Sequence, residues 1–267
     1  MIELDTIYNE NCLDGMKRID NASVDCIVCD LPYEVLNKNN HHAQWDRQIP
    51  FEPLWEQYRR IIKDNAAILL FGQGMFTAKL MLSQPKLWRY NLIWDKCRVT
   101  GFLNANRMPM RCHEDICVFY KSLPPYNPQY SDGLPNHPQG NGKHKHTNHC
   151  YGEYGRDYQG RTYESIPRVA STVPSGKKLP RSIIPIKKEH DGAVLHPTQK
   201  PVELIRYLIR TYTNPGGVIL DNTIGSGTTA IAAIREGRHF IGFELNKQYF
   251  DIAQKRIRLE LSQPTLF

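Results

Sequence analysis

The chain has 267 residues, of which 40% are hydrophobic and 23% are charged, a composition that predicts a packed globular core. It has no apolar run of membrane-spanning length and no signal-peptide pattern at its acidic start, which argues against a membrane or secreted protein and predicts a cytoplasmic location. The net charge of +7 favours a polyanionic partner over a small cation.

Apolar runs of strand length alternate with helical patterns, which predicts an α/β fold with a mostly parallel twisted sheet and helices on both faces. In the first part of the chain we expect an edge strand at 2–8, a short helix within 9–21, a buried strand at 24–29, a loop at 34–50, a helix at 53–63, a buried strand at 66–71, a helix at 75–83, and strands at 90–94 and 116–120. In the last part we expect a helix at 201–212, a strand at 218–220, a helix at 229–236, a strand at 239–243 and a helix at 247–261.

Basic residues concentrate in a connector at 96–114 and in the segment 121–195, which is rich in Pro, Gly, His and Tyr and lacks apolar periodicity. So long a structureless stretch indicates an inserted region with its own task, although a solvated linker is the alternative. Interleaved basic and aromatic side chains suit phosphate contacts and base stacking. The candidate nucleic-acid contacts are Arg98, Arg107, Arg111, Lys143, Lys145, Arg156, Arg161, Arg168, Lys177, Lys178 and Arg181.

The tetrad Asp30-Leu31-Pro32-Tyr33 follows the expected strand at 24–29, at the edge where open α/β sheets bind ligands. Asp30 and the Leu31 carbonyl can each accept a hydrogen bond from an exocyclic amine, and Tyr33 can stack on a flat ring. The alternative is an ordinary turn, because motifs of four residues recur often.

A second candidate site is the glycine loop that contains Gly225 and Gly227, between an expected strand and a helix. Glycines allow a ligand to approach the backbone, and Glu244, which ends the next expected strand, can accept both hydroxyls of a ribose. The loop also fits the G-x-G-x-x-A pattern of dinucleotide-binding proteins, so a nicotinamide-dependent oxidoreductase is a rival from a different class. Asp221 and the three residues before Gly225 favour instead a cationic cofactor such as S-adenosylmethionine.

The tetrad, the basic insertion, the stretch His196-Pro197-Thr198-Gln199-Lys200-Pro201 and the glycine loop occur in an order that resembles the β-class DNA amino-methyltransferases over nearly the whole chain. The resemblance implies a Rossmann-like, S-adenosylmethionine-dependent methyltransferase fold with a catalytic half at 1–120, an inserted target-recognition region at 121–195 and a cofactor-binding half at 196–267. It implies catalysis on a flipped base of double-stranded DNA by Asp30, Leu31, Pro32 and Tyr33. The cofactor-binding residues that it implies are Asn11, Cys12, Asp30, His196, Thr198, Lys200, Asp221, Gly225, Ser226, Gly227, Thr228 and Glu244.

By the same resemblance, Asp at the first tetrad position favours adenine N6 as the target, while an N4-cytosine enzyme of the same class is the alternative. The sequence contains no Pro-Cys dipeptide, which argues against cytosine C5 methylation by a cysteine nucleophile. The chain departs from the family at Leu31, where a second proline is usual, at Thr223, where an aromatic residue is usual, and at Asn11, where Asp is frequent. The resemblance allows two kinds of protein partner, a second copy of the chain in a homodimer and a cognate restriction endonuclease. It gives no reason to expect a membrane as a partner.

Cysteine and histidine patterns predict no metal site. Cys26 and Cys29 lie within the expected strand at 24–29, so buried free thiols are the better interpretation. The cluster that could ligate zinc has no usual pair-and-pair spacing, and a polar loop facing DNA is the preferred interpretation. Its members are His137, His144, His146, His149 and Cys150.

Overall fold

The computed structural model describes residues 2–34, 47–133, 174, 176–188 and 199–262. The chain divides into two compact units. The larger comprises Met1–Asn127 and Arg181–Phe267, and the smaller comprises Pro128–Pro180. In the smaller unit, the short strands β6 (Ser131–Asp132) and β7 (Lys177–Lys178) pair in antiparallel fashion, and Lys177 Nζ lies 2.6 Å from the Asp132 carboxylate.

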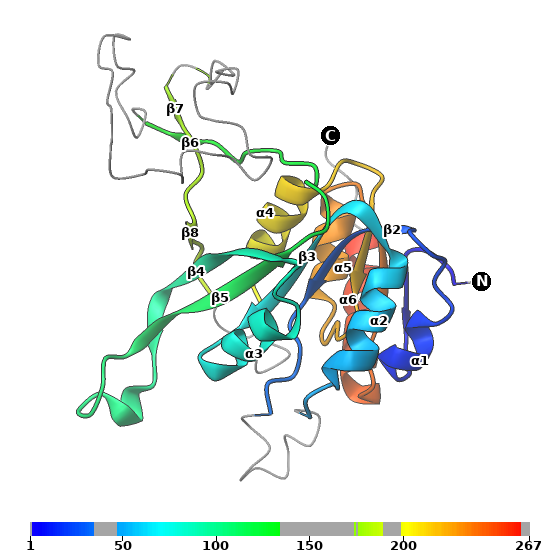
Figure 1. Cartoon of the computed structure of the whole chain (residues 1–267), viewed down its shortest axis with the longest axis horizontal. Coiled ribbons are helices and arrows are strands. Elements are labelled where there is room, and N and C mark those ends of the chain that lie inside the picture. The colour runs from blue at the N-terminus through cyan, green and yellow to red at the C-terminus, as the bar shows by residue number, and fades with distance from the viewer. Residues whose placement is uncertain (1, 35–46, 134–173, 175, 189–198, 263–267) are drawn as a thin grey trace. The chain divides into compact units, whose positions relative to one another are not determined.

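The described part of the larger unit is built on an eight-stranded, mostly parallel sheet (Figure 1). Its strands are β1 (Thr6–Tyr8), β2 (Val24–Cys29), β3 (Ile62–Gly72), β4 (Trp88–Thr100), β5 (Arg111–Phe119), β8 (Ile183–Pro185), β9 (Val218–Asp221) and β10 (His239–Phe243). They lie in the order β1-β10-β9-β2-β3-β5-β4-β8, and β5 runs antiparallel to both of its neighbours. The strand β2 is therefore central, with β9 on one side and β3 on the other.

Helices cover both faces of this sheet, because successive side chains of the buried strands point to opposite sides. Cys26 and Val28 pack with the C-terminal helices, whereas Ile27 and Cys29 pack with the N-terminal ones. The N-terminal helices are α1 (Cys12–Met16), α2 (Phe51–Ile61) and α3 (Met75–Ser83), and the C-terminal helices are α4 (Val202–Tyr212), α5 (Thr228–Arg235) and α6 (Lys247–Ser262). The predicted α/β class is thus confirmed. Among the described residues, no helix is both long enough and apolar enough to cross a bilayer.

Most expected elements lie where the sequence placed them, but the connector at 96–114 differs. The strands β4 and β5 extend into it, so that a long hairpin with a 3-10 helix (Phe102–Asn104) near its turn replaces the expected irregular segment. Its strands carry no apolar alternation because residues 97–100 and 111–113 are exposed and face no core. The segment expected as an insertion also contributes β8, which pairs with β4 in the main sheet.

Candidate active site

The carboxyl ends of β2, β3, β9 and β10 meet at a cavity of about 820 Å³, which both predicted sites line. All four residues of the tetrad reach it from the end of β2, while Gly225 and Ser226 follow β9 and Glu244 follows β10. This is the edge at which open α/β sheets place their ligands. Two sequence motifs almost 200 residues apart therefore form one site.

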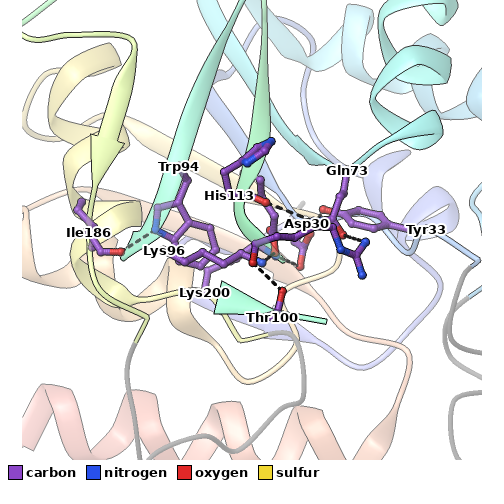
Figure 2. Close-up of polar contacts among 11 residues, drawn as sticks. Asp30, Tyr33, Gln73, Trp94, Lys96, Thr100, His113, Ile186 and Lys200 are labelled. Carbon is purple, nitrogen blue, oxygen red and sulfur yellow. Dashed lines mark hydrogen bonds and ion pairs between the residues drawn. The ribbon is translucent and has the colours of Figure 1, made fainter. Parts of the chain in front are cut away.

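Both carboxylate oxygens of Asp30 are engaged by side chains (Figure 2). The Tyr33 hydroxyl donates a hydrogen bond of 2.7 Å to Oδ1, and the Lys200 ammonium donates one of 2.5 Å to Oδ2. Burial raises the pKa of Asp30 above its ordinary value, and the attraction of Lys200 offsets only part of that effect. Asp30 is therefore a carboxylate held in one orientation with an unusually high proton affinity.

Lys200 belongs to a buried charge chain, which we define as Lys96, Glu114, Lys200 and Asp30. Lys96 Nζ lies 2.6 Å from Glu114 Oε1, and Lys200 Nζ lies 3.2 Å from Glu114 Oε2. Burial opposes the charge of Lys200, but Asp30 and Glu114 outweigh it and raise the pKa of this ammonium. Burial likewise opposes ionisation of Glu114, but Lys200 and Lys96 outweigh it and lower the pKa of that carboxyl. Two cations alternate with two anions, so the fully ionised chain is neutral.

Sequence reasoning missed Lys96 and Glu114 as parts of the site. They lie on adjacent strands, at the point where the hairpin leaves the core, and β-strand pairing sets Trp94 opposite Glu114. The signal that could have found Glu114 is the pair of adjacent acidic residues, Glu114 and Asp115, just before the apolar run of β5, because charges close to a core need partners. Lys96 carries no comparable signal, because it is one of several basic residues in the connector at 96–114.

Leu31 and Tyr33 of the tetrad line the cavity and also pack against the hydrophobic core. The Leu31 side chain is only 2% exposed and belongs to the core cluster beneath α2 and α3, which explains how leucine is accommodated at this position. The Tyr33 ring stacks on Phe76 of α3, with 4.5 Å between ring centroids and 28° between planes. Burial raises the pKa of Tyr33 well above its ordinary value, so its hydroxyl stays protonated and keeps donating to Asp30.

The glycine loop adopts a positive φ, which favours glycine, at two positions. Gly225 has φ of +55° and Gly227 has φ of +86°, and a Cβ at Gly227 would lie 3.0 Å from Ala253 Cβ. The Gly225 N–H donates to Glu244 Oε2 at 2.9 Å, and the Asn246 N–H donates to Glu244 Oε1 at 2.7 Å. Burial raises the pKa of Glu244. Backbone N–H groups thus fix the orientation of this carboxylate.

Asp221, at the end of β9, is buried beside the loop. Its Oδ2 accepts a hydrogen bond of 2.6 Å from the Thr229 hydroxyl, and its Oδ1 accepts one of 3.1 Å from the Thr223 N–H. Burial raises the pKa of Asp221 to about 7. None of these donors is a cation. A positively charged ligand in the cavity would therefore stabilise the ionised form of the Asp221 carboxylate.

Thr223 joins the two motifs directly. Its hydroxyl donates to the backbone carbonyl of Asp30 at 3.0 Å and lies 2.9 Å from the Cys29 thiol. The sequence identifies this position only as a departure from the family, where an aromatic residue is usual. The structure places a hydrogen bond there between the end of β2 and the segment that leads into the glycine loop, and no local sequence pattern predicts this bond.

The remaining predicted residues divide into three groups. Asn11 and Cys12 line the cavity, and the Asn11 side chain also caps α1 by accepting from the Leu13 N–H at 2.9 Å. Ser226 and Thr228 line it too, but the Ser226 hydroxyl donates to Gln199 at 2.9 Å and so supports the loop. Arg98, Arg107 and Arg111 lie on the β4–β5 hairpin, Lys177 and Lys178 form β7, and Arg181 precedes β8. Outside the described residues lie His196, Thr198, Lys143, Lys145, Arg156, Arg161, Arg168 and the cluster His137, His144, His146, His149 and Cys150.

These residues fit a nucleoside cofactor that carries a positive charge. Glu244 presents a fixed carboxylate to a ribose, the missing side chain of Gly225 lets a ligand approach the backbone, and Asp221 lacks a cationic partner among the donors described above. A model of the DNA methylase family that covers N6 and N4 enzymes matches residues 24–255. The chain belongs to this family.

A sequence relative of this DNA methylase is the type II methyltransferase M.HinfI of Haemophilus influenzae. The two are 27% identical over 286 aligned residues, which include 96% of this chain and 68% of M.HinfI. The family match and this relative make the chain a DNA methyltransferase of the N6/N4 class, as the motif order predicted. They support the methyltransferase interpretation over the rival oxidoreductase.

Solved structures share the fold of this methylase. The complex of M1.HpyAVI with S-adenosylmethionine superposes with a TM-score of 0.59 at 20% identity and covers 97% of this chain and 99% of that one. The cytosine-N4-specific PvuII methyltransferase superposes with a TM-score of 0.65 at 13% identity and covers 98% and 88%. The predicted Rossmann-like methyltransferase fold is confirmed, and the predicted cofactor, S-adenosylmethionine, is confirmed at the level of the family.

Proposed function

We propose that this methylase transfers a methyl group from S-adenosylmethionine to the exocyclic N6 of an adenine that is flipped out of double-stranded DNA at a specific sequence. The observation that carries the proposal is the shared cavity, in which the oriented carboxylate of Asp30 and the ribose-binding geometry of Glu244 open into one space. The amine and the cofactor can then be held in contact by groups from opposite sides of a single cavity.

Asp30 would receive the target amine. A carboxylate offers about four lone-pair positions, and Tyr33 and Lys200 use two of them, so Asp30 can still accept a hydrogen bond from an N–H of the base. The Leu31 carbonyl would accept the second N–H, and Leu31 is biased to an extended conformation because it precedes Pro32. Two acceptors on one amine orient the nitrogen lone pair away from both of them, toward the cofactor.

The charge on Asp30 would stabilise the positive charge that develops on nitrogen during transfer. The elevated pKa of Asp30 also makes it a better acceptor for the proton that the nitrogen must finally release. Lys200 opposes premature protonation of Asp30 and fixes its orientation, while Glu114 and Lys96 balance the charge of Lys200. The buried charge chain can therefore keep the Asp30 carboxylate ionised inside the protein, because each buried charge has a partner of opposite sign.

The residues of the cofactor-binding half would contribute by holding the cofactor in place. S-adenosylmethionine supplies a methyl group on a sulfonium, which leaves as a neutral thioether. Glu244 would hold the ribose hydroxyls, and Asp221 would face the positive part of the cofactor. Tyr33, already stacked on Phe76, would support the ring of the flipped base by a face or an edge.

Adenine rather than cytosine is proposed because Asp stands at the first tetrad position. The structural likeness to the cytosine-N4-specific PvuII methyltransferase keeps N4 of cytosine as the alternative. Incubation of purified protein with unmethylated DNA and methyl-labelled S-adenosylmethionine, followed by nucleoside chromatography, should place the label in N6-methyladenine. Label only in N4-methylcytosine would overturn the choice of base.

The same experiment also tests the class of enzyme. If no nucleoside carries label, thermal unfolding with S-adenosylmethionine and with a nicotinamide dinucleotide separates the causes, because a bound ligand raises the unfolding midpoint. Protection by the dinucleotide alone would contradict the methyltransferase proposal. If label is found, sequencing of the modified positions would give the recognition sequence. That sequence would show whether a cognate restriction endonuclease should be sought.

A further inference from the structure

The β4–β5 hairpin has a tip that combines exposed apolar side chains with positive charge. We define the hairpin tip as residues 97–110, a stretch that contains Arg98 and Arg107 and no acidic residue. Phe102 is 81% exposed and Leu103 is 93% exposed, which is unusual for adjacent large apolar side chains. Val99, Met108 and Met110 on the same tip are exposed as well.

Hydrogen bonds within the hairpin tip hold its backbone in a defined conformation. Thr100 pairs with Arg111 across the hairpin, and the Thr100 hydroxyl donates to the Arg111 carbonyl at 3.1 Å. The backbone N–H groups of Asn104 and Met108 close turns onto the carbonyls of Gly101 and Asn104 at 2.9 and 3.0 Å. An irregularity in β4 between Asp95 and Thr100 changes the pairing there, as β-bulges do where a strand must be redirected. In Figure 1 the hairpin extends well beyond the helices that cover the sheet.

The hairpin tip begins where the cavity opens. Arg111 is exposed, lines the cavity and donates to the Gln73 side chain at 3.0 Å, and Gln73 in turn donates to the His113 carbonyl at 3.2 Å. Figure 2 shows Gln73, Thr100 and His113 close to the side chains that surround Asp30. Because Thr100 pairs with Arg111, the next residues of the chain, up to Leu103, stand directly beyond this wall of the cavity.

Duplex DNA is the partner that matches these features. Arginines suit the phosphates that flank a groove, and exposed Phe, Leu and Met side chains are the types that proteins insert between base pairs. A base that leaves the stack opens a gap that apolar atoms can fill, which offsets part of the cost of flipping. A surface this apolar that never met a partner would instead favour aggregation.

We propose that Phe102 and Leu103 form a wedge that enters the DNA stack beside the target base, while Arg98 and Arg107 hold the flanking phosphates. The proposal rests on the proposed function, because it takes duplex DNA with a flipped base as the substrate. It adds a step that the tetrad alone does not provide, namely stabilisation of the duplex from which the base has departed.

The test compares Phe102→Ala/Leu103→Ala with the parent protein and with Leu259→Ala/Leu261→Ala, a control that removes two exposed leucines of α6. Each protein methylates two duplexes that contain the mapped recognition site, one fully paired and one with an abasic position opposite the target base. The wedge variant should lose about tenfold or more of its rate on the paired duplex. On the second duplex, where flipping is already easier, it should approach the rate of the parent, and the control should match the parent on both.

Equal rates of the wedge variant and the parent on the paired duplex would overturn the proposal. An equal loss on both duplexes would also overturn it, because the tip would then serve general binding. A change in sedimentation without a change in the rate per active site would assign the tip to a second copy of this chain. If the parent methylates no DNA, so that no recognition site can be mapped, the proposed function fails by itself. Unchanged affinity of the wedge variant for duplex DNA would then reject the wedge independently.

Arginine substitution gives a second, separable readout. Arg98→Ala/Arg107→Ala should weaken binding to all duplexes and reduce the slope of log affinity against log salt by about one for each phosphate that is no longer neutralised. The wedge variant should keep the slope of the parent, because Phe and Leu displace no counterions. A reduced slope in the wedge variant would contradict the division of roles between apolar and basic residues.

Discussion

Two carboxylates face the same cavity, Asp30 at the end of β2 and Glu244 at the end of β10, and they are held in opposite ways. Asp30 is bound by side chains, one of them a charged ammonium, whereas Glu244 accepts from two backbone N–H groups. Backbone donors carry no net charge and cannot titrate, so they fix geometry at every pH. A charged side-chain partner fixes the protonation state as well. Under the proposed function, the Asp30 end of the cavity is organised to control charge, and the Glu244 end is organised to hold a fixed geometry.

The largest expected effect comes from removing the carboxylate of Asp30, to which we assign the catalytic role. Asp30→Ala should lower kcat at least about a hundredfold, because it removes the group that faces the developing charge. The dissociation constant for S-adenosylmethionine, measured by calorimetry, should change little, since Glu244 and the glycine loop are retained. A variant that keeps the parent's kcat would refute the role assigned to Asp30.

Glu244→Gln should show the reverse pattern. The amide keeps one acceptor oxygen but places an NH₂ against a backbone N–H, and it would lose the charge-assisted hydrogen bonds that we propose between Glu244 and the ribose. We expect the affinity for S-adenosylmethionine to fall about tenfold to a hundredfold. At saturating cofactor, kcat should stay near that of the parent. A fall in kcat with unchanged affinity would show that the two carboxylates do not divide the work in this way.

Lys200→Met tests the charge chain. Without the ammonium, burial and the nearby Glu114 carboxylate both raise the pKa of Asp30, and only the Tyr33 hydrogen bond opposes them. The pKa should therefore rise further, and a larger fraction of Asp30 should be protonated at neutral pH. We expect kcat to fall about tenfold near pH 7 and to recover partly as the pH is raised. Lys200→Arg, which keeps the charge, is the matched control. A uniform loss at all pH values would indicate a purely structural role.

Asp221 gives a pH dependence with a definite sign. Its pKa is raised by burial from the ordinary 3.8 to about 7, so its contribution to stability is complete below about pH 4 and is lost as the pH rises through about 7. A cationic cofactor favours the ionised form. The affinity for S-adenosylmethionine should therefore increase severalfold between about pH 6 and 8. Titrations of Asp221→Asn should lack this increase, and the same slope in both proteins would assign it to another group.

A comparably small effect is expected from removing the hydrogen bond between Thr223 and the Asp30 carbonyl. Thr223→Val keeps the shape of the side chain but removes the hydroxyl that donates to the Asp30 carbonyl. The loss of one neutral hydrogen bond should lower kcat/KM by about threefold to tenfold. Thr223→Ser retains the hydroxyl and should behave as the parent. If valine is tolerated fully, the two ends are coupled through the sheet and not through this bond.

The sequence predicted the buried elements well because burial leaves a local pattern. The strand at 24–29, the helix at 75–83 and the strand at 239–243 agree with the structure residue for residue. The hairpin was missed because strands that face solvent carry no apolar alternation. The sequence motifs predicted Asp30 and Glu244 as site residues. Lys96 and Glu114, by contrast, become neighbours only through strand pairing and the approach of Lys200. Such contacts depend on tertiary structure, which spacing along the chain does not encode.

The position of β2 between β3 and β9 has a consequence during translation. β2 pairs with β9, and Thr223 bonds to Asp30 across 193 positions of the chain. At synthesis rates of about 5–20 residues per second, roughly 10–40 s separate the appearance of the two. During that interval the nascent chain exposes one edge of its central apolar strand and has no glycine loop. The methylase should therefore depend on chaperones while it is being made, and it gains its active site only when its last third has emerged.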